Sequence, residues 1–427
     1  MKVINISEIF EVPNINAKDA DLKKIIYKIP DLMLINNNYF PGSEYLCVCS
    51  GGTTSSCAKE NLITLDLRKN YNYIKYNPQK KIVKIGGGVL MGSLLDELEK
   101  HGRIFPTGLS SLPGVGFILT GGISPLSRRY GLAIDNIDSV KGYLGNGEYF
   151  AISKKEIKKE EIDLWEAIKG AAPFLSIITE IGLKTFESSP ILICEGFVDD
   201  NEFKEIITLA EMFPPNQSLQ WMHSERKYIY IVCELKTAKD KIHNENLLNK
   251  IKGFKALKHK ILKSFNQAIF FPKELKLFEL NQTNHSEVIS LLGCSIENRI
   301  YEFTKLMEDI NENRPNKSCY VACQQLGSST NLKKNYEDYF IHRDSVWKPW
   351  IYTSWKKNDL KDKELAINWL IKSWIKLKNF FPHIHLAQLH NHLDFHREEI
   401  ELAFGKKLNK LKLLKNIYDP MGNLPPL

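Results

Sequence analysis

Glycine is concentrated in one part of this chain, and that concentration constrains the fold more than any other feature. Of the 25 glycines, 16 lie between Gly51 and Gly147, a stretch that holds under a quarter of the 427 residues. A chain needs glycine where its backbone turns tightly or passes close to another group, because glycine has no Cβ atom. We therefore expect several tight loops and close backbone approaches within residues 51–147.

The same stretch carries alternating signals for strands, turns and helices. Lys81–Ile85 resembles a strand and runs into Gly86-Gly87-Gly88, after which Val89–His101 spaces its leucines as a helix does. This pattern predicts a strand, a glycine turn and a helix. Three more glycine loops follow, at Pro106–Gly108, Pro113–Gly116 and Thr120–Gly122. Beyond them we expect a short helix over 162–169 and a strand over 177–185.

The composition is that of a soluble globular protein. Hydrophobic residues make up 43% and charged residues 25%, which excludes a collagen, an extended disordered chain and a disulfide scaffold. At roughly 100–200 residues per domain, the length predicts two or three domains. The net charge of +8 is mild for 427 residues, so we expect no nucleic-acid partner.

Targeting signals are weak throughout. Apolar runs such as Tyr228–Cys233 are far shorter than the roughly 18–20 residues of a membrane span. Met1–Val12 includes Glu8 and Glu11, where a signal peptide would be apolar. The eight cysteines have no regular spacing and are expected to be reduced thiols. We predict a cytoplasmic protein without a membrane segment.

The amino-acid composition of the chain changes near Pro190, where glycine becomes scarce. Aromatic strands such as Tyr228–Cys233 precede Lys-rich stretches between Lys236 and Lys276, which we interpret as solvated helical faces rather than a basic contact surface. Residues 339–396 are rich in Trp and His, and Glu398–Lys415 reads as a terminal helix. A second domain is therefore expected to begin near residue 190.

A loop after the first apolar strand suits a pyrophosphate. Ser50–Ser56 offers consecutive backbone N–H groups and several hydroxyls after Gly51 and Gly52. It is not a Walker A loop, and Gly114 and Gly116 lack the third glycine of the dinucleotide-binding fingerprint, because Leu119 stands there. Alone, this loop could equally be a polar hairpin turn. The later glycine loops favour an extended dinucleotide instead.

The order of these motifs resembles a known family. The glycine loops together with Leu126–Asn136 look like the FAD-binding domain of the vanillyl-alcohol-oxidase (PCMH) type. The C-terminal part resembles berberine-bridge-enzyme-like oxidoreductases through Ile341-His342-Arg343, Asn391–Asp394 and Tyr418-Asp419-Pro420. The resemblance covers residues 12–187 and 339–427, and the middle of the chain is placed by elimination.

The resemblance implies an α+β fold with FAD as cofactor. We expect a two-lobed FAD-binding domain over residues 1–188, a substrate domain with an antiparallel sheet backed by helices over 189–380, and a C-terminal segment over 381–427 that returns to the FAD domain. The residues implied to bind FAD are Ser50, Gly51, Gly52, Thr53, Thr54, Ser55, Thr107, Ser110, Gly114, Gly116, Thr120, Gly121, Gly122, Asp135, Ile177 and Asn391.

This chain departs from the family at the two flavin-linking positions. Many relatives attach FAD covalently through a His and a Cys, and the matching positions here hold Thr53 and Ser110. A hydroxyl is a far weaker nucleophile at neutral pH than an imidazole or a thiolate. Cys49 and Cys57 flank the first loop and are interpreted as buried structural thiols. We therefore expect noncovalent FAD.

Five histidines lie close together at His383, His385, His390, His392 and His396. On a single strand His383 and His385 would share one face while His390 and His392 share the opposite one, so we expect no metal site. Relatives use a tyrosine as proton acceptor in this segment, where Leu389 stands here. His392 falls at the second aromatic position, and an imidazole is a competent base at neutral pH. We expect His392, and after it His390, to be catalytic, with structural histidines as the open alternative.

The implied activity is removal of a hydride from a carbon of a small organic substrate, an alcohol, sugar or amine, to the flavin. Oxygen or another electron acceptor would then reoxidise the cofactor. The alternative is a degenerate relative that binds FAD or a partner without turnover, since the linking residues and the usual tyrosine are absent.

Overall fold

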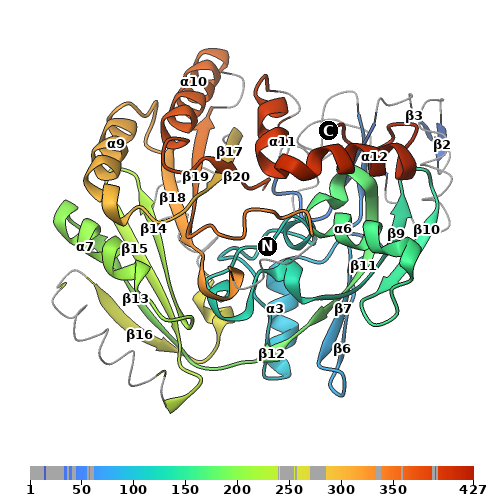
Figure 1. Cartoon of the computed structure of the whole chain (residues 1–427), viewed down its shortest axis with the longest axis horizontal. Helices are drawn as coiled ribbons and strands as arrows, with labels where there is room; N and C mark the ends of the chain where they lie inside the picture. Colours follow the sequence, from blue (N-terminus) through green and yellow to red (C-terminus); the bar gives the residue numbers. More distant parts are fainter. Residues whose placement is uncertain are drawn as a thin grey trace.

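The computed structural model describes most of the chain beyond residue 44. Residues 45–54, 57, 62–238, 240, 254, 257–269, 285–331, 338–356, 359–386, 390 and 393–427 are described with their side chains, and residues 14–15, 33–35 and 38–40 by their backbone. Two lobes lie side by side (Figure 1). The first lobe is on the right of the view, the second is on the left, and the C-terminal helices, in red, lie at the top.

The first lobe contains a parallel and an antiparallel sheet. The parallel sheet has the order β1-β5-β4, and the antiparallel sheet has the order β10-β9-β11-β7-β6. The strands are β1 (Asn14–Ile15), β4 (Leu46–Cys49), β5 (Ile63–Asp66), β6 (Ile74–Asn77), β7 (Ile82–Gly86), β9 (Ile137–Leu144), β10 (Tyr149–Ser153) and β11 (Ser176–Lys184). Two short pairs complete the strands: β2 (Met33–Ile35) with β3 (Asn38–Phe40), and β8 (Arg103–Ile104) with β12 (Phe186–Glu187).

Two helices of this lobe lie where the sequence patterns predict them. Helix α3 (Met91–Lys100) follows the glycine turn, as predicted, and buries Met91, Leu94, Leu95 and Leu98. Two short helices lie among the later glycine loops, α4 (Gly116–Leu119) and α5 (Ser127–Tyr130). Helix α6 (Ile162–Leu175) is longer than the predicted helix over 162–169, because the chain resumes helical geometry after a kink at Lys169 and Gly170.

The second lobe is an antiparallel sheet of eight strands in the order β16-β13-β15-β14-β18-β19-β17-β20. Its strands are β13 (Ile191–Val198), β14 (Gln217–His223), β15 (Lys227–Glu234), β16 (Lys258–Leu262), β17 (His285–Leu292), β18 (Tyr320–Gln325), β19 (Trp347–Trp355) and β20 (His383–Ile384). Strand β16 corrects the sequence interpretation of Lys236–Lys276 as helical, because residues 258–262 pair with the edge of β13.

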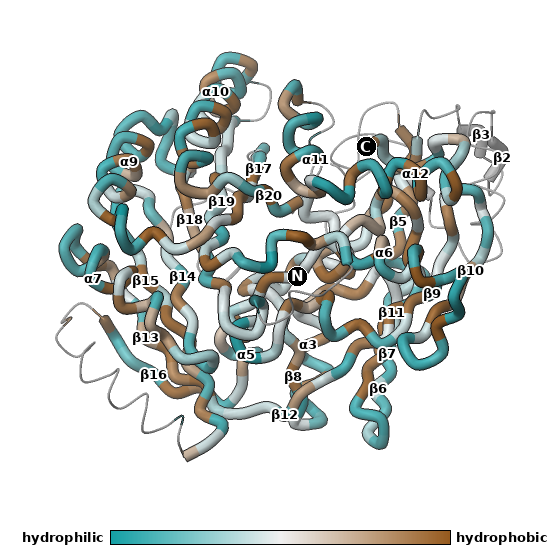
Figure 2. Tube along the Cα trace, viewed as in Figure 1, coloured by the Kyte–Doolittle hydropathy of each residue, from teal (hydrophilic) through white to brown (hydrophobic). Residues whose placement is uncertain are grey.

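Successive side chains of each strand point to opposite faces, so this sheet has two different faces. On one face lie helices α7 (Asp200–Glu211), α9 (Ile300–Glu312) and α10 (Leu360–Leu377), whose apolar residues share a core with Val321, Cys323 and Ile351 of the sheet. The other face, with Tyr230, Tyr320 and Ala322, packs towards the first lobe through Leu95 and Leu126. Figure 2 shows apolar residues gathered on the strands and hydrophilic residues on the outer helices.

Buried polar contacts join the two lobes. The guanidinium group of Arg128, on α5, donates hydrogen bonds to the carbonyl oxygens of Gln217 (2.7 Å) and Phe213 (2.6 Å) and to that of Leu326. The arginine is 4% exposed and has all three carbonyls as acceptors, so these bonds hold strands of the second lobe against the first.

The C-terminal segment contacts both lobes. Strand β20 pairs with β17, and two helices follow, α11 (His396–Phe404) and α12 (Leu408–Tyr418). The sequence predicted one helix over 398–415, but Gly405 has a positive φ of 46° and ends the first helix. Lys415 donates to the carbonyl oxygen of Phe174 (2.9 Å), which fixes α12 against the first lobe. The proposed domain boundaries themselves stay predictions.

Candidate cofactor and substrate site

Two of the glycine loops touch each other at the end of β4. A Cβ atom added to Gly51 would lie 2.2 Å from the nitrogen of Gly114, and one added to Gly114 would lie 2.4 Å from the Oγ of Ser50. No side chain fits at such distances, so both positions require glycine. Ser50 donates a hydrogen bond to the carbonyl oxygen of Gly87 (2.6 Å), which ties the first loop to the end of β7 as well.

The loops present two runs of unused backbone donors. The N–H groups of Gly51, Gly52 and Thr53 donate no hydrogen bond to another described residue, and neither do those of residues 114–116. Of these residues Gly114 and Val115 are buried, and buried N–H groups are nearly always paired in folded proteins, so their unused donors indicate a ligand against the two touching loops. Consecutive N–H groups of this kind bind anionic groups, above all phosphates.

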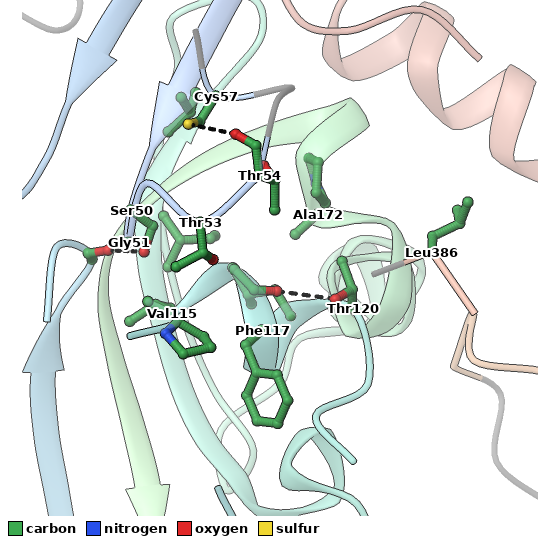
Figure 3. A pocket seen from close by; sticks show the side chains of 18 of the residues that line it. Ser50, Gly51, Thr53, Thr54, Cys57, Val115, Phe117, Thr120, Ala172 and Leu386 are labelled. Carbon is green, nitrogen blue, oxygen red and sulfur yellow. Dashed lines mark hydrogen bonds between the residues drawn. The ribbon is translucent and has the colours of Figure 1, made fainter. Parts of the chain in front are cut away.

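Both loops line one cavity of about 320 Å³. Figure 3 shows side chains of both loops, of Cys57 and of Ala172 around this space. A Cβ atom on Gly116 would meet nothing within 4 Å, so this glycine faces open space in the cavity. We call the backbone side of the cavity, residues 50–54 and 113–120, the glycine wall.

The opposite side of the cavity comes from the second lobe. Gln324 of β18 and Lys348 of β19 stand directly opposite each other in register, and His385 follows β20. All three line the cavity, and we call them the sheet wall. Gln324 and Lys348 point to this side because Cys323 and Trp347 point to the helix-covered face.

Burial changes the pKa values of the sheet wall. Desolvation lowers the pKa of Lys348 to about 8, and the ammonium group lies 4.5 Å from the ring centroid of Trp350. Burial, with a smaller effect from the charge of Lys348, lowers the pKa of His385 to about 3. His385 is therefore neutral at physiological pH, with its Nε2 3.0 Å from the carbonyl oxygen of Thr120.

The structure brings together eight of the residues predicted to bind FAD. Ser50, Gly51, Gly52, Thr53, Thr54, Gly114, Gly116 and Thr120 all line the cavity. Ile177 does not: its side chain belongs to the core around Leu46 and Leu65, and its neighbours Ser176 and Ile178 line the cavity instead. Side chains of a strand alternate between faces, so a prediction displaced by one residue points to the wrong face.

Four further predicted residues, and Asp135, which is described below, lie outside the cavity lining. Thr107 is fully buried, and the Oγ of Ser110 accepts a hydrogen bond from the N–H of Leu112 (3.3 Å). Gly121 and Gly122 have positive φ angles of 130° and 71°, and their backbone packs against Phe340, Phe117 and Ala133. These glycines are needed for the turn itself.

Asp135 has a structural position in this fold. Its carboxylate accepts a hydrogen bond from the N–H of Leu132 (2.9 Å) and lies 3.0 Å from the guanidinium group of Arg343. Arg343 also pairs with Asp338 at 2.6 Å. The arginine joins the segment after residue 338 to the turn at 132–135, away from the cavity lining.

His390 has a position that does not support its predicted role as a base. Its Nδ1 lies 2.7 Å from Glu399 and its Nε2 lies 3.3 Å from Glu287, and all three side chains are buried. Burial lowers the pKa of His390, but the charge of Glu399 and the hydrogen bonds to both carboxylates outweigh it and raise that pKa to about 10. The imidazole is therefore already protonated at neutral pH and cannot accept a proton.

Ser55, Asn391 and His392 lie outside the described residues, so their predicted roles stay predictions. Among the described residues, no three His, Cys, Asp or Glu side chains are grouped so that they could hold a metal ion.

Gln324 and Lys348 were not among the residues predicted from the sequence. A signal was present: Lys348 is the charged residue in the otherwise apolar run Trp347–Trp350. Lysine is almost never buried unless it has a partner or a function. The run could have indicated a functional lysine, although no local pattern says which cavity it faces.

Cys57 was expected to be a structural thiol, and the structure places it both in the core and on the cavity (Figure 3). Its Sγ lies 2.9 Å from the carbonyl oxygen of Thr54. A hydrogen bond from the neighbouring thiol of Cys49 lowers the pKa of Cys57, and the same bond with burial raises the pKa of Cys49.

Comparison with known proteins gives a family for part of the chain. A family model described as an FAD binding domain matches residues 42–153. (R)-6-hydroxynicotine oxidase of Paenarthrobacter nicotinovorans is 33% identical over 158 residues, which are 36% of this chain and 33% of that enzyme. An FAD-linked oxidoreductase of Dictyostelium discoideum is 24% identical over 381 residues, which are 87% of this chain and 79% of the relative.

Solved structures share the whole fold. A berberine bridge enzyme variant in complex with (S)-reticuline superimposes with a TM-score of 0.78 at 18% identity, covering 98% of this chain and 89% of that one. 6-Hydroxy-D-nicotine oxidase from Arthrobacter nicotinovorans gives a TM-score of 0.75 at 19% identity, covering 96% and 90%. At these identities the likeness concerns the fold, which is the α+β arrangement predicted from the sequence.

Proposed function

We propose that the chain is an FAD-linked oxidoreductase that removes a hydride from a carbon of a small organic substrate, with its FAD held noncovalently. The substrate classes that we propose are alcohols, sugars and amines. Oxygen or another electron acceptor completes the cycle.

One observation carries the proposal: a single cavity joins unused backbone donors on one wall to polar side chains on the other. The N–H groups of the glycine wall suit the two phosphates of a dinucleotide. The sheet wall offers Gln324, Lys348 and His385 to a second molecule. A cofactor site and a substrate site that share one cavity are what transfer between two bound molecules requires.

The residues present fit FAD. Gly51, Gly52 and Thr53 would hold one phosphate and residues 114–116 the other, while the apolar residues Ala172 and Ile178 line the cavity for a flat ring system. Bound FAD would supply the capacity to take up a hydride equivalent. The chain itself orients the substrate on the sheet wall and keeps water out.

The nucleophiles near the cavity support noncovalent binding. Thr53 offers a hydroxyl, and Ser110 lies outside the lining. Cys57 is the thiol on the cavity among the described residues, and its Sγ is engaged with the carbonyl oxygen of Thr54.

A proton must leave the hydroxyl or amine of the substrate as the hydride leaves its carbon. His385 is a poor acceptor because burial lowers its pKa to about 3. We therefore keep His392 as the proposed acceptor, next to the ion-paired His390 along the chain. His390, two residues before it, is held by Glu287 and Glu399.

The setting of the reaction is also part of the proposal. We propose a cytoplasmic enzyme that acts without a nucleic-acid partner or a membrane. The structure adds that none of its described helices has the length and apolar character of a membrane span.

Anaerobic reduction tests the function. The protein, loaded with FAD, is mixed without oxygen with panels of alcohols, sugars and amines, and the flavin absorbance is followed. We expect at least one class to bleach the flavin and air to restore the colour. A protein that binds FAD but that no panel member bleaches would favour the alternative, a binding protein without turnover.

A further inference from the structure

The sheet wall contains a buried cation without a counter-ion. Lys348 is 9% exposed, and its ammonium group makes no hydrogen bond or ion pair with a described residue. Among the described residues, the ammonium group contacts the ring of Trp350, with the ring centroid 4.5 Å away. Burying an unpaired charge is costly, so this lysine weakens the fold unless something else compensates it.

The surroundings of Lys348 supply no negative charge. Among the described residues that line the cavity, Lys348 is the one charged side chain, and no Asp or Glu is present. Two titratable groups interact electrostatically with Lys348: the imidazole of His385 and the thiol of Cys323. His385 is neutral, and burial raises the pKa of Cys323 far above its usual range, so both are uncharged.

A neutral donor stands beside the cation. The side chain of Gln324 makes no hydrogen bond with a described residue, and Gln324 lies opposite Lys348 in the pairing of β18 with β19. One strand further, Gln220 lies opposite Gln324. An ammonium group and an amide on adjacent strands can donate to the two oxygens of one carboxylate, and charge-assisted bonds of this kind are the strong ones.

We propose that Lys348 and Gln324 bind the carboxylate of the substrate, so that the enzyme acts on a small organic acid. This inference rests on the proposed function, because it assigns the sheet wall to the substrate. It narrows the alcohols, sugars and amines above to those that carry an acidic group.

The negative charge that Lys348 meets could instead belong to FAD. A cation beside the flavin ring would favour the reduced, anionic cofactor, whereas a cation for a substrate would discriminate between acids and neutral molecules of the same shape. The test therefore uses probes that differ in charge alone and measures binding rather than turnover.

Benzoate and benzamide are the probes, because they share a shape and differ in charge. Each is titrated by calorimetry into the FAD-loaded protein and, separately, into protein stripped of FAD. We expect benzoate to bind at least about tenfold more tightly than benzamide to the loaded wild type, as a charge-assisted bond in place of a neutral one predicts. Lys348→Met should remove this preference.

Two more variants and the pH sharpen the test. Gln324→Glu places a carboxylate opposite Lys348 and should also abolish the preference. Lys260→Met, at the far edge of the sheet where Lys260 pairs with Glu195, should leave it unchanged. Because benzoate needs the protonated lysine, its affinity should fall as the pH rises through about 8. In Lys348→Met it should stay level.

Folding and cofactor binding are measured on the same samples. Lys348→Met should keep its FAD and melt no lower than the wild type, because it removes an uncompensated charge. If Lys348→Met retains the preference for benzoate, the inference is overturned. It is also overturned if the variant loses FAD affinity or shifts the flavin potential while discrimination stays, since the lysine then serves the cofactor. Absence of FAD binding in the wild type would instead refute the proposed function.

Discussion

The two walls of the cavity differ in the groups that they present to a ligand. The glycine wall presents backbone N–H groups on loops that touch, where a Cβ atom added to Gly51 would lie 2.2 Å from the backbone of Gly114. The sheet wall presents side chains, among them the buried ammonium group of Lys348, whose pKa burial lowers to about 8. We infer that cofactor binding is sensitive to size and substrate binding to pH, and the predictions below test this contrast.

The largest effect is expected from a volume change in the glycine wall. Gly51→Val should abolish FAD binding, because the side chain cannot fit against Gly114 without separating the two loops. Gly116→Val is the matched variant: its side chain enters open cavity space. It should melt like the apo wild type and still lose FAD. FAD titration followed by fluorescence quenching, together with thermal melts, measures both.

If Gly116→Val binds FAD as well as the wild type does, the cofactor does not lie against this loop. If Gly51→Val binds FAD normally, the contact between the loops has no bearing on the cofactor, and the hairpin interpretation of residues 50–56 returns.

Loss of the proposed proton acceptor is expected to act on rate. His392→Ala should slow anaerobic flavin reduction by roughly 10²–10⁴-fold with little effect on FAD affinity, as for loss of a positioned acid-base group. In the wild type the rate should fall as the pH drops through the histidine pKa, because a neutral imidazole accepts the proton. That acid limb should be missing in His392→Ala. Stopped-flow reduction across pH 5–9 measures both.

The contrast between the walls also explains what the sequence predicts. Gly51, Gly114 and Gly116 were found because a requirement for glycine is local and visible in the printed residues. The side chains of the sheet wall depend on the register between β14, β18 and β19, which are distant in sequence. No local sequence pattern determines that register. The apolar run around Lys348 indicates burial but does not say which cavity the lysine faces. Ile177 shows the same difficulty in one strand, where the neighbouring residues face the cavity.

His390 shows how two neighbouring carboxylates can change the expected role of a histidine. The isolated residue suggests a base, but Glu287 and Glu399 come from β17 and α11, and their approach is a property of the tertiary fold. His390→Leu should destabilise the protein by about 3–5 kcal/mol, because it removes the buried cation that lies between two buried carboxylates. Urea unfolding at pH 7 measures the loss.

The pH dependence of that stability has a definite sign. The pKa of His390 is raised from about 6.5 to about 10 on folding, so its contribution is complete below pH 6.5 and is lost as the pH rises towards 10. The difference in unfolding free energy between wild type and His390→Leu should therefore shrink from pH 6.5 to pH 10. The double variant that adds Glu399→Gln is the control and should recover part of the loss. A difference that does not vary with pH would contradict the ion pair.

The smallest effect concerns the free cofactor. A dissociable ligand stabilises the folded protein by RT ln(1 + [L]/Kd), which is about 2.7 kcal/mol at a hundredfold excess over Kd. The melting temperature of the wild type should therefore rise with added FAD, and that of Gly116→Val should not. A melting temperature that ignores added FAD in both proteins would show that the glycine wall holds no dissociable dinucleotide.

The most direct test of the central claim, that FAD binds noncovalently against the glycine wall, is the absorbance of the purified protein before and after acid precipitation. We predict a visible flavin spectrum, complete release of the flavin into the supernatant as FAD, and a colourless but folded Gly116→Val. A wild-type protein that is colourless and takes up no added FAD would contradict the claim. Yellow colour retained in the pellet would contradict noncovalent binding, and its loss in Cys57→Ser would identify the thiol that holds the flavin.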